Sequence, residues 1–178
     1  KLLLKESKYS LVTPKEAGVN LAVEENGNTF KENALIKAKA YSIATNYLCL
    51  ADDSGIEIDA LNGMPGIYSA RYGGPDLTDK DRVNLVLSKM RDVPWSLRTA
   101  RFRTSLALAW PEGENAVYEG VLEGVIGFES KGANGFGYDP IFFLPSLQST
   151  VGELTNIQKA QISHRSIAVS KLLKFLLA

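Results

Sequence analysis

The fold is decided by two stretches in which apolar and polar residues alternate, ARFRTSLALAW at residues 100–110 and AVYEGVLEGVIG at residues 116–127. Period-two alternation is typical of β-strands, because successive side chains of a strand point to opposite faces of its sheet. Only a polar turn at residues 111–115 separates the two stretches. A connection this short predicts an antiparallel hairpin.

Helices and shorter strands are expected on either side of the hairpin. Apolar runs at residues 47–51 and 141–144 are typical of buried strands, and residues 56–60 alternate as a further strand does. Capping residues and helical apolar spacing predict helices over residues 29–46, over residues 78–90 and from Ser163 onward. This mixture predicts an α/β fold that is mixed rather than purely doubly wound.

The length and composition favour one globular domain or two small lobes. The chain has 178 residues, of which 45% are hydrophobic and 22% are charged, and this is enough apolar material for a core. Its 20 basic and 20 acidic side chains give a formal net charge of zero. Proteins that grip a nucleic-acid backbone usually carry a basic excess, so extended DNA or RNA is disfavoured as a partner. Binding of a small anion in a local basic pocket is compatible with a net charge of zero.

The cellular compartment is indicated by cysteine usage. Cys49 is the only cysteine and cannot form an internal disulfide. The sequence shows no signal peptide and no apolar run of membrane-spanning length. These features favour a reducing cytoplasm and argue against a membrane partner.

The apolar run at residues 47–51 is expected to end at two adjacent carboxylates, Asp52 and Asp53, followed by Ser54 and Gly55. Crowded like charges are unfavourable unless a cation or hydrogen bonds compensate them. The pair is therefore either a solvated turn or a place where a divalent metal binds, and taken alone it favours neither.

Two glutamates near the first predicted helix differ in how well they suit a role as metal ligands. Glu32 follows Thr29 at capping-box spacing, so its carboxylate has a structural role available at the amide of Thr29. Glu25 precedes the helix in a polar loop without such a local partner, which makes it the better metal-ligand candidate. Lys37 and Lys39 belong to a solvated face of this helix, or one of them points its charge at an anion near the Asp pair.

The last third of the chain is rich in residues that suit a ligand. Residues 132–140, GANGFGYDP, combine glycines, two aromatics and a carboxylate. Glycines let a backbone come close to a flat or anionic ligand, and an exposed aromatic can stack on a base. A glycine-rich loop by itself is a weak signal, however, and is more often an ordinary turn. His164 and Arg165 open the last predicted helix, where free backbone amides favour an anion.

Five stretches stand out when the chain is taken as a whole: TFKENA at residues 29–34, ADDSG at residues 51–55, PGIYSARY at residues 65–72, GFGYDP at residues 135–140 and ISHR at residues 162–165. Taken together they resemble the inosine triphosphate pyrophosphatase family. The resemblance covers essentially the whole chain in the family's order. It implies hydrolysis of ITP, dITP and XTP to the monophosphate and pyrophosphate. It also implies an elongated mixed sheet with flanking helices, two lobes around a nucleotide cleft, a homodimer and dependence on Mg²⁺.

The resemblance also implies roles for matching residues. Asp53 is the expected general base and a metal ligand, with Glu25 as the second metal ligand and Asp52 beside them. The substrate-binding residues implied are Ser54, Lys37, Phe136, Gly137, Tyr138, Asp139, Lys159, His164 and Arg165. Among them Lys37 faces the phosphates and Phe136 stacks on the base.

The sequence departs from the family's pattern in two places. Residues 1–6 read as the last turns of a helix, and the family's first strand and its Thr/Ser-x-Asn-x-x-Lys phosphate-binding turn are not seen before them. Residues 157–158 are Ile-Gln where the family usually has acids. The single domain expected over residues 1–178 therefore has an alternative function, nucleotide binding without turnover. A sensor of damaged bases in nucleic acid is disfavoured by the zero net charge.

Overall fold

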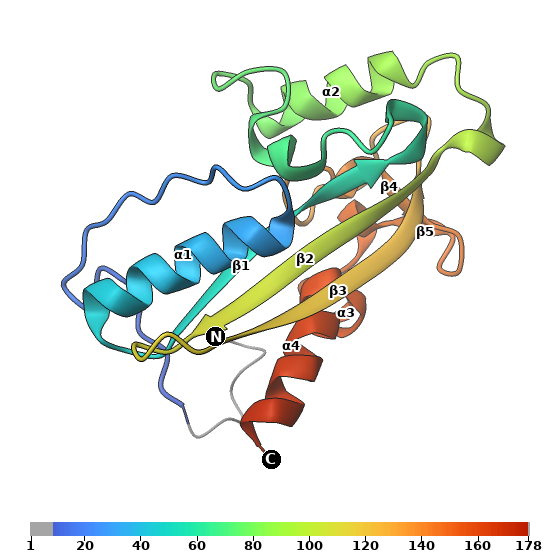
Figure 1. Cartoon of the computed structure of the whole chain (residues 1–178). Coiled ribbons are helices and arrows are strands. Elements are labelled where there is room, and N and C mark those ends of the chain that lie inside the picture. Colours follow the sequence, from blue (N-terminus) through green and yellow to red (C-terminus); the bar gives the residue numbers. More distant parts are fainter. Residues whose placement is uncertain (1–8, 178) are drawn as a thin grey trace. The chain divides into compact units, whose positions relative to one another are not determined.

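Figure 1 shows the computed structural model, which describes residues 9–177. The helix end expected at residues 1–6 lies outside the described residues. The chain divides into two compact units: unit 1 comprises residues 1–54, 104–120 and 164–178, and unit 2 comprises residues 55–103 and 121–163. The chain therefore passes from one unit to the other within its three longest strands.

Helices and strands alternate irregularly along the chain. The helices are α1 (Phe30–Thr45), α2 (Asp79–Lys89), α3 (Asn156–Ile162) and α4 (His164–Leu176). The strands are β1 (Cys49–Ile58), β2 (Thr99–Ala109), β3 (Asn115–Ile126), β4 (Phe142–Leu144) and β5 (Ser149–Thr150), and they form one sheet in the order β1-β2-β3-β4-β5. The mixed α/β class predicted from the sequence is confirmed.

Neighbouring strands of this sheet run antiparallel. The predicted hairpin is β2 and β3, closed by a hydrogen bond from the Trp110 amide to the Glu114 carbonyl (2.9 Å). Strand β4 pairs antiparallel with both β3 and β5. Between β1 and β2, Ser54 contacts Thr104 while Asp59, just beyond β1, contacts Thr99. From the first contact to the second, the residue number rises from 54 to 59 along β1 and falls from 104 to 99 along β2, so the two strands are antiparallel.

Strand β1 corrects one prediction. The predicted end of the strand at residues 47–51 was wrong, because β1 continues through the Asp pair to Ile58. It therefore includes most of the separate strand that was expected at residues 56–60. Aspartate has a low strand propensity, but propensity yields to pairing with a neighbouring strand. Asp52 and Asp53 are therefore successive strand residues, and their side chains point to opposite faces.

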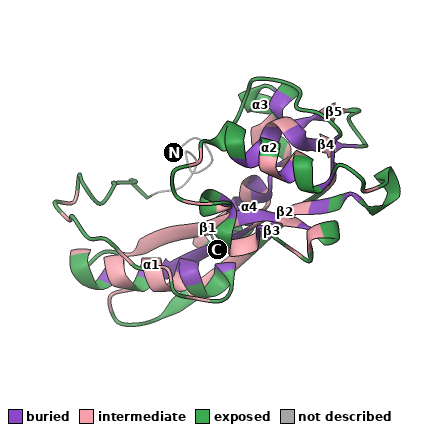
Figure 2. Cartoon of the chain, turned by 90° about the horizontal axis from the view of Figure 1, so that it is seen from above, coloured by how far each residue is buried: buried purple, intermediate pink, exposed green. Residues whose placement is uncertain are grey.

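Unit 1 has an apolar layer on each face of its strands. On one face, Ala34 and Ala38 of α1 pack with Ala107 and Ala109 of β2. On the other face, Leu106 and Leu108 of β2 pack with Ala168, Val169 and Leu172 of α4. Helix α4 comes so close that a Cβ added to Gly120 of β3 would lie 1.9 Å from the carbonyl oxygen of His164. Helix α1 carries both buried and exposed residues, as expected for a helix that packs on one side (Figure 2).

Unit 2 has its own core. Its buried members include Ile56, Ile58, Val86, Ile126 and Phe142, contributed by β1, α2, β3 and β4. The rings of Phe102 and Phe142 lie 4.3 Å apart between centroids. Each unit thus buries apolar side chains on its own elements.

The helix ends follow local capping signals, with two differences from the predictions. Thr29 accepts the amide of Glu32 (3.1 Å), but the Glu32 carboxylate accepts from Asn28 (2.6 Å) and not from Thr29 as predicted. Helix α3 was not predicted, although Thr155 and Gln158 form a complete capping box at its start.

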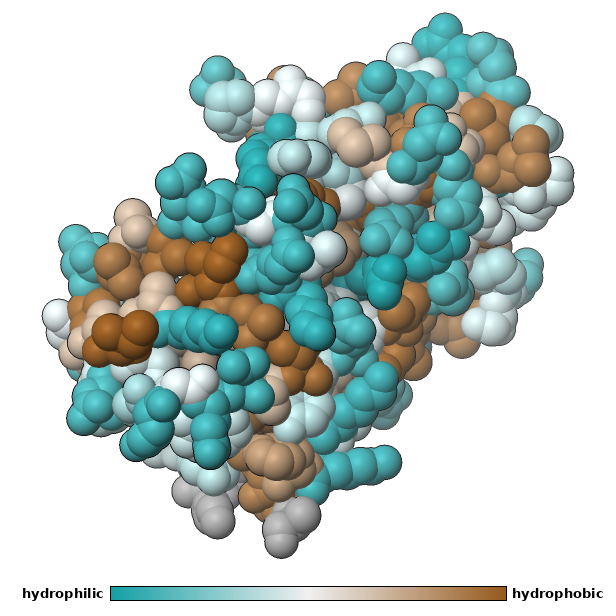
Figure 3. Space-filling view, viewed as in Figure 1, coloured by the Kyte–Doolittle hydropathy of each residue, from teal (hydrophilic) through white to brown (hydrophobic). Residues whose placement is uncertain are grey.

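The surface combines hydrophilic cover with local apolar groups. In Figure 3 hydrophobic side chains gather at the left, where α1 lies, and smaller hydrophobic groups appear at the right among hydrophilic side chains. Ile43 of α1 is 78% exposed. Within residues 9–177, no helix is both long and apolar enough to cross a membrane.

Candidate active site

Asp53 lies at the centre of a polar group on the α1 face of β1. Its carboxylate is 3.1 Å from the ammonium of Lys37 and accepts a hydrogen bond from the Asn33 amide nitrogen (3.3 Å). The same Lys37 ammonium is 3.2 Å from the carboxylate of Glu25. Glu25, Lys37 and Asp53, which are far apart in the sequence, therefore meet around one cationic group.

Local structure explains this convergence. Asn33 and Lys37 are one helical turn apart on α1, so both face Asp53. Asn33 is fully buried, and its other amide atom, Oδ1, accepts the backbone N–H of Gly27 (2.8 Å), which fixes the loop that carries Glu25. A Cβ on Gly27 would lie 2.8 Å from this Asn33 oxygen, so the close approach needs glycine. Asn33 was not predicted as a site residue, although it lies inside the stretch TFKENA that carries the resemblance.

The environment of Asp53 raises the pKa of its carboxyl. Burial raises the pKa of the Asp53 carboxyl above its ordinary value, and the nearby negative charge of Glu25 raises it further. The charge and hydrogen bond of Lys37 and the hydrogen bond of Asn33 act in the opposite direction without cancelling the effect of burial. Asp53 thus holds a proton more readily than an exposed aspartate, which is the property of a general base.

Asp52 belongs to a second polar group on the α4 face of the same strand. Its Oδ2 atom is 3.0 Å from both Nε and Nη2 of Arg165 and accepts a hydrogen bond from Ser54 (2.9 Å). Ser54 also contacts the hydroxyl of Thr104 (2.6 Å). Burial alone would raise the pKa of Asp52, but the charge of Arg165 and the hydrogen bonds from Ser54 and Arg165 outweigh it, so the pKa lies below its ordinary value.

The two adjacent carboxylates therefore have different tasks available. Their pKa values shift in opposite directions, an arrangement that separates a proton acceptor from a permanently charged group. Glu25 and Asp53 supply carboxylate oxygens, the ligands that hard divalent cations prefer. No group of three or more His, Cys, Asp or Glu side chains suited to a metal occurs within residues 9–177. A cation at Glu25 and Asp53 would take its remaining ligands from water and from phosphate oxygens.

A second set of predicted residues forms a glycine-rich loop in unit 2. The Phe136 ring is 62% exposed, and the Lys159 ammonium lies 4.4 Å from its centroid. Asp139 is buried, pairs with Lys159 and accepts the backbone N–H of Phe136 (2.8 Å). Gly135 has φ +79°, and a Cβ there would lie 2.0 Å from Asp139 Oδ2, so this turn requires glycine.

The same loop is fixed at two further points. The Gly137 amide donates to Asp79 at the start of α2 (2.9 Å). Tyr138 is only 5% exposed, and its hydroxyl donates to the Ser69 carbonyl (2.9 Å). Burial raises the pKa of the Tyr138 phenol. The Ser69 hydroxyl in turn accepts the Ile56 amide (2.9 Å) and donates to the Gly66 carbonyl (2.6 Å), so the short 3₁₀ helix Gly66–Arg71 links β1 to this loop.

The predicted site residues therefore fall into one set in each unit. Unit 1 holds Glu25, Lys37, Asp53, Ser54, His164 and Arg165, and unit 2 holds Phe136, Gly137, Tyr138, Asp139 and Lys159. His164 is 5% exposed at the first position of α4. Within unit 2, the ring of Phe136 is exposed and lies beside the Lys159 ammonium, whereas Tyr138 and Asp139 are buried and hold the loop. Their predicted contact with the base remains a prediction.

The sequence is similar to known enzymes over most of its length. The family model described as "Ham1 family" matches residues 1–175. The dITP/XTP pyrophosphatase of Exiguobacterium sibiricum is 52% identical over 149 residues, which is 84% of this chain and 75% of that protein. The dITP/XTP pyrophosphatase of Bacillus subtilis is 44% identical over 176 residues, 99% of this chain and 89% of that protein.

Solved structures give the same result for the fold. A HAM1 protein from Coxiella burnetii matches with a TM-score of 0.93 and 41% identity, covering 99% of this chain and 90% of that one. The Ham1 protein of Staphylococcus aureus matches with a TM-score of 0.84 and 44% identity, covering 88% of this chain and 81% of that one.

Proposed function

The chain belongs to the Ham1 family, and from this membership we propose that it hydrolyses the deaminated purine nucleotides ITP, dITP and XTP to the monophosphate and pyrophosphate. The observation that carries the proposal is identity of 44–52% to dITP/XTP pyrophosphatases over at least 84% of the chain. The set of residues around Lys37 supports it, because two carboxylates and a lysine suit a metal-bound triphosphate.

Glu25 and Asp53 are the residues that would hold Mg²⁺. Their oxygens both lie close to the Lys37 ammonium, at 3.2 and 3.1 Å, so the site already accommodates positive charge between two carboxylates. Bound there, the metal would neutralise charge on the triphosphate. Lys37 supplies a further positive charge that can turn to the phosphates.

Asp53 acts as the general base. Burial raises its pKa, so it can take a proton from a water molecule during attack. The water oxygen bonds to the α-phosphorus, the bond from the α-phosphorus to the bridging oxygen breaks, and pyrophosphate leaves. Asn33 holds the Asp53 carboxylate in position through its amide nitrogen (3.3 Å).

Base selection follows from hydrogen-bond donors. Hypoxanthine and xanthine carry an oxygen at C6, where adenine carries an amino group. Phe136 stacks on the base, while Lys159, His164 and Arg165 present donors that suit the oxygen and oppose the amino group. A site built to hydrogen-bond one group can discriminate by roughly 10⁴. Ser54, Gly137, Tyr138 and Asp139 complete the proposed substrate site. A homodimer and a cytoplasmic location remain predictions.

The experiment is an assay of pyrophosphate and phosphate release from ITP and from ATP, with and without Mg²⁺. Pyrophosphate from ITP that requires the metal is expected, and Asp53→Asn should lower kcat by roughly 10²- to 10⁴-fold. Glu25→Gln should raise the Mg²⁺ concentration needed for half-maximal rate, whereas Glu24→Gln, its exposed neighbour, should not. ITP binding without product would instead support the alternative of a binding protein without turnover.

A further inference from the structure

Arg98 is a buried cation whose hydrogen-bond partners are all neutral. It is 1% exposed, and its guanidinium donates to four backbone carbonyls of unit 2. The acceptors are those of Ile126 (2.7 Å), Met90 (2.5 Å), Val93 (3.1 Å) and Gly127 (2.7 Å). Carbonyl oxygens satisfy N–H groups but do not cancel a unit charge.

Fully buried arginines are normally paired with an acid. Among residues 9–177, no ion pair joins Arg98 or Arg91 to a carboxylate at 4.0 Å or less. Burial lowers the pKa of the Arg98 guanidinium from its ordinary value. The Met90 carbonyl at the end of α2 offsets part of the cost of burying this charge, because a helix carries negative partial charge at its C-terminus.

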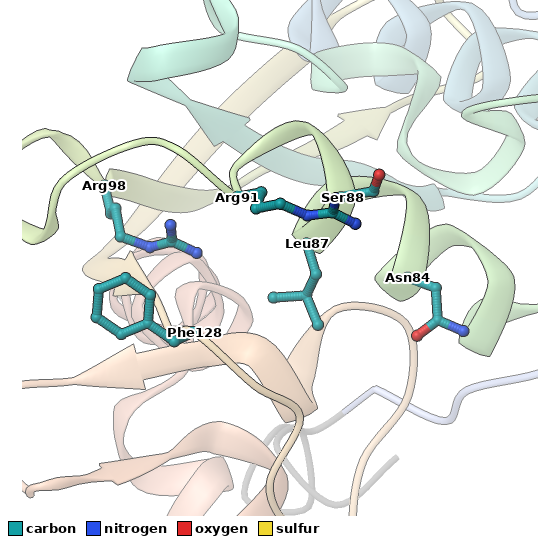
Figure 4. Close-up of a pocket in the computed structure, with 6 residues that line it drawn as sticks. All are labelled: Asn84, Leu87, Ser88, Arg91, Arg98 and Phe128. Atoms are coloured by element: carbon teal, nitrogen blue, oxygen red, sulfur yellow. The ribbon is translucent and has the colours of Figure 1, made fainter.

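Arg98 lines a cavity of about 330 Å³ together with Asn84, Leu87, Ser88, Arg91 and Phe128 (Figure 4). Two of these residues are cations, two are polar and none is an acid. The Arg98 guanidinium lies 4.5 Å from the centroid of the Phe128 ring, which fixes its plane. In Figure 4, Arg98 lies at the left with Phe128 below it, and Arg91 lies above Leu87 with its guanidinium directed toward Ser88.

The acidic residues that neighbour the cavity lining in the sequence do not neutralise its positive charge. Glu129 follows Phe128 in the sequence, but its carboxylate pairs with Lys131 (3.1 Å). Asp92 follows Arg91 and is exposed. The cavity therefore has an excess of positive charge that a small anion would balance. Its volume is at the lower end of the range for small-molecule sites, about 300–1,000 Å³.

We propose that this cavity is a binding site for a phosphate-type oxyanion. Arg98 supplies a preorganised, buried charge, and Arg91 closes on the anion from the exposed side as a bidentate donor. The Asn84 amide and the Ser88 hydroxyl on α2 add neutral donors. None of the lining residues belongs to the proposed nucleotide site. The ligand is either inorganic pyrophosphate, the proposed product, or a single phosphate group.

Trp95 offers a local signal for the test, because its ring lies 5.6 Å from that of Phe128. The chain has two tryptophans, so Trp110→Phe leaves Trp95 as the only one. The Trp110→Phe protein is titrated without metal, at constant ionic strength, with inorganic pyrophosphate, inorganic phosphate and chloride. A saturable change with pyrophosphate or phosphate but not with chloride is expected. Tighter binding of pyrophosphate identifies a diphosphate site, and equal binding identifies a single-phosphate site.

Variants on the same background decide whether the signal comes from this cavity. Arg91→Gln should weaken binding at least tenfold, whereas Arg103→Gln, which changes a half-buried arginine of β2 that pairs with Glu57, should not change it. Lys37→Gln should also leave it unchanged, which separates this cavity from phosphate binding in unit 1. Arg98 anchors several carbonyls, so the test uses Arg91 instead. Absence of a saturable response at millimolar anion, or equal affinity of the Arg91 and Arg103 variants, would overturn the proposal.

Discussion

Asp139 and Asp79 hold neighbouring amides of one loop from very different environments. Asp139 accepts the Phe136 amide (2.8 Å) and pairs with Lys159, and its side chain is 3% exposed. Asp79 accepts the Gly137 amide (2.9 Å), and its side chain is 60% exposed. Each carboxylate also faces a cation, Lys159 for Asp139 and Arg82 for Asp79 (3.5 Å), so each alanine variant loses one amide acceptor and one ion-pair partner. The two sites differ in the burial of the carboxylate. Asp139→Ala is expected to destabilise the protein far more.

The magnitude follows from what each change leaves behind. Removing one partner of a buried ion pair costs about 3–5 kcal/mol, because the other charge stays buried. The Lys159 side chain is 17% exposed and can partly regain water, so the lower end applies to Asp139→Ala, at about 3 kcal/mol. Asp79 is largely solvated and lies 3.5 Å from Arg82, so water can replace its carboxylate beside that guanidinium, and exposed charged contacts of this kind contribute about 0.2–1 kcal/mol. The expected difference between the two variants is therefore at least about 2 kcal/mol.

Urea unfolding followed by circular dichroism measures both variants. With a slope of about 2 kcal/mol per molar urea, Asp139→Ala should lower the midpoint by about 1.5 M and Asp79→Ala by less than about 0.5 M. Asp139→Asn, which keeps an acceptor for the Phe136 amide, should fall between wild type and Asp139→Ala. Equal midpoints for the two alanine variants would refute the argument that burial of the Asp139–Lys159 pair determines the stability of this loop.

Three further outcomes are expected. Tyr138→Phe, which removes only the hydrogen bond to the Ser69 carbonyl, should raise KM for ITP several-fold with kcat little changed. Steady-state kinetics measure both constants, and a fall in kcat at unchanged KM would contradict this expectation. Hydrogen bonds from Arg101 and then Thr99 lower the pKa of Asp59, so its contribution to stability is present at neutral pH and is lost as the pH falls from 3.8 through the lowered pKa. The stability difference between wild type and Asp59→Asn, about 0.5 kcal/mol at neutral pH for an exposed pair, should therefore shrink as the pH falls below 3.8 in urea unfolding at a series of pH values. Gly120→Ala should lower the free energy of unfolding by about 1–3 kcal/mol, because a methyl group there meets the first backbone carbonyl of α4. An unfolding temperature equal to that of the wild type would contradict this packing.

Local signals in the sequence were sufficient for much of the architecture. Thr78 and Asp81 form a capping box that starts α2, and Thr29 caps α1, because a cap needs only residues within one turn. The alternation over residues 100–127 predicted the hairpin of β2 and β3. The family and the reaction also followed from short motifs in fixed order, since chemistry at a site depends on particular side chains.

Contacts between distant segments decided what the sequence left open. The Asp pair was expected at the end of a strand, but pairing with β2 extends β1 through it and places Asp52 and Asp53 on opposite faces. Only then do α1 and α4 give the two carboxylates different partners, Lys37 for one and Arg165 for the other. Their pKa values diverge for that reason. Arg98 gave no local signal either, because burial of its charge depends on carbonyls from residues 90–93 and 126–127, which only the tertiary structure brings together.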